Sequence, residues 1–195
     1  MEETDLKSIL LLLLLQKEGM IGRYRLKEML DMHQHEGVVR RMLEDLTQRQ
    51  WVRPTRSGCM LTESGEERIA SFLQEKDIVD LGPVDLRRAD IGPESTVVQL
   101  RNKRITGPIL TLRDMAVQVG AKGALILTYE NGVLGDPLAY RSFSTRHPEI
   151  TQSLENRLEL QEGDIAVVGF ADTYPKALEG ALAIGLEIAK SETEK

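Results

Sequence analysis

Hydrophobic residues recur at helical spacing in four stretches of the first 78 residues. The first stretch, residues 5–17, contains seven consecutive apolar residues from Ile9 to Leu15. An apolar run of this length covers every face of a helix, so it predicts a helix buried on all sides, with a C-cap at Gly19. Three more helices are predicted, over residues 23–32, from near residues 34–37 onward, and over residues 62–75.

The third of these helices has a clear inner face. Val39, Leu43 and Leu46 recur at i, i+4 and i+7, and Val38 and Met42 broaden the apolar stripe. With this stripe facing inward, the exposed positions are those at Gln34, Gly37, Arg41, Glu44 and Gln48, and Arg40 lies on the flank.

A two-stranded ribbon is predicted between the third and fourth helices. Trp51 and Val52 begin an extended segment, and Ser57-Gly58 is a turn dipeptide. Residues 59–61 then form the returning strand of the ribbon. Thr62 then has the position and chemistry of a helix N-cap.

The sequence pattern changes after Leu81, where Gly-Pro pairs separate short segments that are predicted to be extended. Strands and helices alternate from here, and Asn131-Gly132 is a strong hairpin signal. The predicted strands cover residues 96–100, 123–129 and 164–170, and the predicted helices cover residues 109–119, a segment after Pro148, and residues 174–190. This alternation predicts an α/β sandwich in which helices cover a sheet, with the domain boundary near residues 77–81.

Charge changes this picture locally. The net charge is −6, which argues against a protein that binds nucleic acid over its whole surface. Between Gly37 and Leu61, however, five arginines face only Glu44 and Asp45, a local charge of +3. Local charge decides phosphate contact more than the total does.

The single cysteine, Cys59, excludes an intramolecular disulfide and fits a reducing compartment. The leucine run is too short to span a bilayer, and the acidic start of the chain lacks the positive region of a signal peptide. We therefore expect a cytoplasmic protein without a membrane partner.

Three motifs carry a family resemblance. The segments are Gly22-Arg23-Tyr24-Arg25-Leu26, Glu36-Gly37-Val38-Val39-Arg40 and Leu61-Thr62-Glu63-Ser64-Gly65. They resemble archaeal winged-helix transcriptional regulators, in which Leu-Thr-x-x-Gly closes the wing, as in the broader MarR- and PadR-like groups. The layout also resembles an uncharacterised archaeal family that joins such a module to a C-terminal α/β domain. This chain differs from those families in two ways: its predicted wing tip is very short, and its third helix carries the acidic residues Glu44 and Asp45.

The resemblance implies an α+β fold with an N-terminal winged helix-turn-helix in residues 1–78 and a C-terminal α/β sandwich domain in residues 79–195. It implies double-stranded DNA as the partner, because a helix fits the major groove and its first turns reach base edges. Candidate base-reading residues are Gln34, His35 and Arg41. Candidate phosphate contacts are Arg40, Arg49, Arg53 and Arg56.

The C-terminal domain is expected to sense a small-molecule effector or to mediate assembly. The strand-to-helix turn at Asp172-Thr173 could bind an anion through free N–H groups, although both residues are also ordinary N-caps. Arg113, one turn into another helix, is a second ligand candidate or a surface charge. A homodimer is expected for two reasons. The outer side of the apolar first helix has to be covered by another surface, and a two-fold axis between two subunits matches the symmetry of palindromic DNA half-sites.

Catalysis has little support in the sequence. The histidines form no zinc signature, and no nucleophile elbow, P-loop or dinucleotide fingerprint occurs. We expect no enzymatic activity, catalytic residue, metal site or cofactor. Oxidant sensing by Cys59 is a minor alternative. The main alternative is a metabolite-binding protein or enzyme that uses the winged helix as a scaffold or protein-interaction module.

Overall fold

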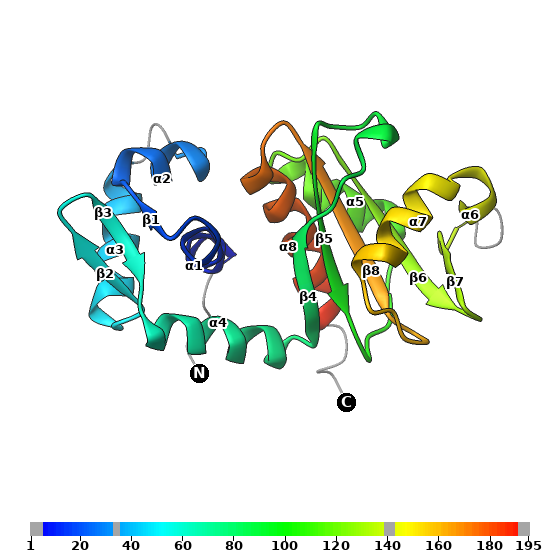
Figure 1. Ribbon diagram of the computed structural model, residues 1–195, viewed down its shortest axis with the longest axis horizontal. Coiled ribbons are helices and arrows are strands. Elements are labelled where there is room, and N and C mark those ends of the chain that lie inside the picture. The colour runs from blue at the N-terminus through cyan, green and yellow to red at the C-terminus, as the bar shows by residue number, and fades with distance from the viewer. Residues whose placement is uncertain (1–5, 33–35, 139–142, 191–195) are drawn as a thin grey trace. The chain divides into compact units, whose positions relative to one another are not determined.

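The computed structural model describes residues 6–32, 36–138 and 143–190 and is a mixed α+β structure with two antiparallel sheets (Figure 1). The chain divides into two units, residues 1–73 and 74–195. The division falls within the last turn of α4 (Glu63–Glu75), slightly ahead of the boundary predicted after residue 78.

The first unit is helical around a small sheet, in which β1, β3 and β2 lie in that order and pair antiparallel. Its elements before α4 follow the chain as α1 (Leu6–Glu18), β1 (Met20–Ile21), α2 (Arg23–Met29), α3 (Glu36–Gln48), β2 (Val52–Thr55) and β3 (Gly58–Leu61).

The buried helix predicted from the leucine run is confirmed. Every residue from Ile9 to Leu15 is at most 4% exposed. The helix ends where predicted, because Gly19 adopts a φ of 78° and its N–H donates to the carbonyl of Leu15 at 2.8 Å.

Helix α3 has the predicted inner face with one correction. Val39 and Leu46 are buried and Leu43 is half-buried, but Val38 is 44% exposed. Each residue turns the helix by 100°, so Val38 lies about 100° from Val39 and outside the arc that Val39, Leu43 and Leu46 share.

The second unit is built on a sheet with the strand order β4-β5-β8-β6-β7, in which each neighbouring pair is antiparallel. Its elements are β4 (Ile78–Pro83), η1 (Arg87–Ala89), β5 (Glu94–Leu100), α5 (Ile109–Gln118), β6 (Gly123–Glu130), β7 (Val133–Gly135), α6 (Phe143–Arg146), α7 (Pro148–Arg157), β8 (Ile165–Ala171) and α8 (Tyr174–Lys190).

Helices cover both faces of this sheet. Along β8, Ala166, Val168 and Phe170 face a core shared with α6 and α7, whereas the alternating residues face α8. Helix α8 approaches closely, since a Cβ atom at Gly169 would overlap the backbone of Ala177. The small residues of α8 are therefore explained by tight packing.

The hairpin at Asn131-Gly132 is confirmed, with φ of 54° and 76° at its two turn residues. Strand β4 was missed, because its sequence reads as a linker. It lies at the edge of the sheet, where Pro83 is tolerated and only one side needs backbone partners.

A carboxylate holds together the ends of β5 and β8. The Asp164 side chain, 1% exposed, accepts hydrogen bonds from Arg101 Nε and Nη2, each at 3.0 Å, and from Gln99 Nε2 at 2.7 Å. Burial alone would raise the pKa of Asp164, but the hydrogen bonds from Arg101, the Gln161 N–H and Gln99 outweigh it and lower the pKa below its usual value.

We expect Asp164→Asn to lower the free energy of unfolding by about 3 kcal/mol at pH 7, because Arg101 loses its buried partner. The pKa of Asp164 is lowered on folding. Its stabilisation is therefore present above the unfolded value of about 3.9 and is lost as pH falls through the lower folded value. Urea unfolding followed by circular dichroism should show the two proteins converging in stability at acid pH. A difference that stays constant down to about pH 2 would contradict this assignment.

Candidate functional site

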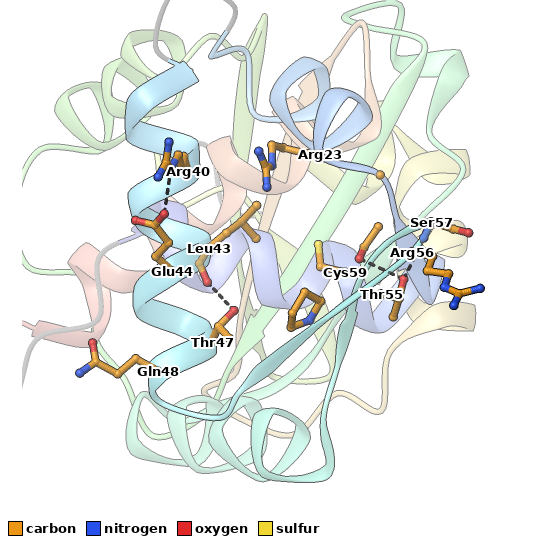
Figure 2. Close-up of a pocket in the computed structure, with 13 residues that line it drawn as sticks. Arg23, Arg40, Leu43, Glu44, Thr47, Gln48, Thr55, Arg56, Ser57 and Cys59 are labelled. Carbon is orange, nitrogen blue, oxygen red and sulfur yellow. Dashed lines mark hydrogen bonds and ion pairs between the residues drawn. The ribbon is translucent and has the colours of Figure 1, made fainter.

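A groove of about 750 Å³ lies between α3 and the β2–β3 hairpin of the first unit (Figure 2). One wall is the exposed side of α3, and the other is the tip of the hairpin together with the start of α2. The lining residues are Gly22, Arg23, Arg40, Leu43, Glu44, Thr47, Gln48, Pro54, Thr55, Arg56, Ser57, Gly58 and Cys59. The groove thus has charged and hydroxyl-bearing walls over a floor that includes apolar side chains.

The hairpin tip is a two-residue turn made by Arg56 and Ser57, one residue earlier than the predicted Ser57-Gly58. Thr55 and Gly58 are paired across the strands. The Thr55 hydroxyl donates to the Gly58 carbonyl at 3.0 Å and accepts from the Ser57 N–H at 3.3 Å. These bonds fix the tip and with it the backbone from which Arg56 extends.

Gly58 is required because β1 passes directly against it. Its φ is 154°, and a Cβ atom there would overlap the backbone carbonyl group of Ile21. The neighbouring pair Ile21–Cys59 continues this pairing. The chain leaves β1 at Gly22, so the pairing brings Arg23 to the wall of the groove.

The base of the hairpin is fixed to α4. Thr62 is the N-cap predicted from the sequence, since its hydroxyl accepts from the Gly65 N–H at 3.1 Å. A Cβ atom at Gly65 would overlap the Trp51 carbonyl, which explains the glycine of the Leu-Thr-x-x-Gly motif. The Trp51 ring contacts the guanidinium groups of Arg49 and Arg68, at 5.2 and 5.6 Å from its centroid.

The groove carries more positive than negative charge. Arg23, Arg40 and Arg56 line it, against the single carboxylate of Glu44. Arg40 Nε donates to Glu44 Oε1 at 2.8 Å, and this hydrogen bond and charge raise the pKa of Arg40 further. Among the described residues, Arg23 and Arg56 have no carboxylate partner. Two of the three guanidinium groups are therefore available to an anion.

Cys59 lies on the groove floor and is 6% exposed, and its Sγ donates to the Ile21 carbonyl at 3.4 Å. Burial raises the pKa of Cys59, and the nearby charge of Arg23 only partly opposes this. The thiol form is favoured, so the residue is a poor nucleophile and its role here is packing.

The other predicted DNA contacts are distributed differently. Arg41 is exposed on α3 outside the groove lining. Arg49 donates to Asp45 at 2.8 Å and packs on Trp51, while Arg53 lies opposite Met60 with its guanidinium 3.8 Å from that sulfur. Gln34 and His35 lie outside the described residues.

Arg23 is the groove residue that the sequence reasoning did not single out. It is separated from Arg40 and Arg56 along the chain, and no periodicity links it to them. Only the pairing of β1 with β3 brings it there, and strand pairing over such a separation leaves no local signal in a single sequence.

Each of the three ligand candidates of the second unit makes a contact within the fold. Arg113 donates to Asp136 at 2.9 Å, and its buried Nε has no hydrogen-bond partner in the described structure. Asp172 pairs with Lys122 at 2.5 Å. The Thr173 carbonyl accepts from the Ala177 N–H at 3.0 Å, which is the first turn of α8.

Within residues 6–32, 36–138 and 143–190, no group of three or more His, Cys, Asp or Glu side chains is arranged to hold a metal ion. In the same part of the chain, no helix has both the length and the apolar character needed to cross a membrane.

Comparisons with known proteins identify no activity. A family described as "Domain of unknown function (DUF4443)" matches residues 91–188. A hypothetical protein from Pyrococcus horikoshii OT3 is similar in structure, with a TM-score of 0.73 and 24% identity over 97% of this chain and 95% of that chain. At this identity the likeness shows the fold alone. No curated protein matches.

We expect Gly58→Ala to destabilise the first unit by about 1–3 kcal/mol, because the added methyl group must push β1 away from β3. Gly37→Ala is the matched control, since nothing lies within 4 Å of a Cβ atom at this α3 position. That control should be neutral or stabilising by up to about 1 kcal/mol. Fluorescence of Trp51, the single tryptophan, reports thermal unfolding of this unit. Equal stability of the two variants would refute the proposed close approach.

Proposed function

The chain belongs to the family described as "Domain of unknown function (DUF4443)", and we propose that it is a DNA-binding transcriptional regulator whose first unit is a winged helix-turn-helix. The order of elements supports this proposal, because three helices precede a hairpin that is followed by a fourth helix, with β1 completing the small sheet. The observation that carries it is the groove between α3 and the hairpin, with three arginines against one carboxylate.

The concentration of these arginines is local. The chain as a whole has a net charge of −6, which disfavours contact with a polyanion over its whole surface. A site that attracts phosphate therefore has to gather its cations in one place, and the groove does so with Arg23, Arg40 and Arg56.

The shape of this region supports duplex DNA as the proposed partner. The groove is bounded by an exposed helix face on one side and a projecting hairpin on the other (Figure 2). In our proposal α3 enters the major groove, while Arg56 on the hairpin tip and Arg23 at the start of α2 contact backbone phosphates. Arg41, exposed on α3, remains a candidate for base contact.

The second unit is proposed to sense a small ligand or to mediate assembly in the cytoplasm. A homodimer with a two-fold axis would present two copies of α3 to two half-sites about 34 Å apart. A ligand acts in such a dimer by favouring one arrangement of the two copies over another, and so changes the fraction of protein competent to bind DNA.

The test is selection of genomic DNA fragments by the purified protein at low salt, followed by affinity measurement on a selected fragment. We expect Arg56→Ala and Arg23→Ala each to weaken binding and to reduce the slope of log affinity against log salt by about 0.9, because each removes one phosphate contact. Arg87→Ala in the second unit is the control, since Arg87 is exposed and pairs with Asp85. It should leave affinity and slope unchanged.

A wild-type protein that enriches no fragment at low salt would rule out the proposed function. Equal losses in all three variants would show that affinity follows total charge and not the groove.

A further inference from the structure

Helix α3 presents a row of three polar residues spaced four apart. Arg40, Glu44 and Gln48 are exposed and line the same groove, so they follow one face of the helix for more than two turns (Figure 2). This face is the one that lies toward DNA in the proposed function.

The negative charge of Glu44 is not expected in a surface that serves only to attract phosphate. It is 59% exposed, and its carboxylate accepts a hydrogen bond from Arg40 Nε at 2.8 Å. Near a phosphate this charge is repulsive, so its presence weakens general binding. An ionised carboxylate has only hydrogen-bond acceptors and needs a donor from its partner.

The major groove offers amino donors at two places, the N4 amino group of cytosine and the N6 amino group of adenine. Guanine and thymine present hydrogen-bond acceptors and no donors there, and these acceptors repel a carboxylate. Adenine also carries the N7 acceptor beside its amino group, and this atom repels the second carboxylate oxygen. Cytosine has no acceptor on its major-groove edge, so it is the base that suits Glu44.

We propose that Glu44 is a specificity-determining residue that selects cytosine at one position of the bound DNA. The inference rests on the proposed function and adds a base preference to it. The hydrogen bond from Arg40 holds the carboxylate, and the same guanidinium lies one helical turn from Glu44, where it can reach the O6 and N7 atoms of guanine in a neighbouring base pair. The exposed row thus reads a G·C-containing step.

Asp45 provides a matched control within the same helix. It carries the same charge as Glu44 and also pairs with an arginine four residues away, at 2.8 Å from Arg49 Nε. It does not line the groove. Removal of either acid changes the net charge equally, but only Glu44 lines the groove.

The experiment is selection from a random duplex library with the full-length wild-type protein and with Glu44→Ala, Glu44→Gln and Asp45→Ala. We expect wild type and Asp45→Ala to prefer cytosine about fivefold or more at one fixed position of the selected site. Glu44→Ala should lose that preference, so that sites with and without the cytosine bind with similar affinity. Glu44→Gln should shift the preference toward adenine, because an amide pairs with adenine N6 and N7.

Circular dichroism confirms folding of each variant before selection. If Glu44→Ala retains the wild-type preference, Glu44 does not read a base, and the inference fails while DNA binding stands. The same holds if Asp45→Ala loses the preference equally. If the wild-type protein selects no DNA, both the inference and the proposed function fail.

Discussion

The first unit depends on one backbone contact, the close passage of β1 over Gly58. This passage pairs a two-residue strand with the returning strand of the hairpin, and it is possible only because Gly58 lacks a side chain. The pairing fixes three things together: the hairpin, the start of α2, and the Cys59 thiol under both. The groove between α3 and the hairpin exists because these parts are held at a defined separation, so its shape follows from sheet geometry and not from the arginines that line it.

Much of the fold follows from local patterns in the sequence. The buried leucine helix, the inner face of α3, the Thr62 cap and the Asn131-Gly132 hairpin each depend on neighbours a few residues apart, which a single sequence displays. Features that depend on distant partners were missed. Strand β4 reads as a linker, because only its pairing with β5 makes it a strand. The apolar side chain of Val38 predicts burial, but its position on α3 leaves it exposed.

The candidate site was predictable only in part, for the same reason. Arg40 and Arg56 were identified because they lie on a helix and a ribbon that the sequence predicts. Arg23 was not, because it reaches the groove through the β1–β3 pairing. The reverse also holds for Arg49, which counts as a basic residue in the sequence but is engaged in the structure by Asp45 and the ring of Trp51. The local excess of arginines in the sequence identifies the region of the groove. Only the packing in the structure shows which arginines are engaged within the fold and which are available to a ligand.

The second unit shows the first of these two uses of arginine. Three of its arginines pair with carboxylates: Arg101 with Asp164, Arg157 with Asp80, and Arg113 with Asp136. These pairs tie together segments far apart in the chain, so their charges are used within the fold. In the groove, Arg23 and Arg56 have no carboxylate partner among the described residues, and the one acid present is shared with Arg40. The groove therefore brings together two guanidinium groups that have no carboxylate partner within the described part of the chain and a third that shares one. In the proposed function, the regularly spaced phosphates of a polyanion engage these groups together.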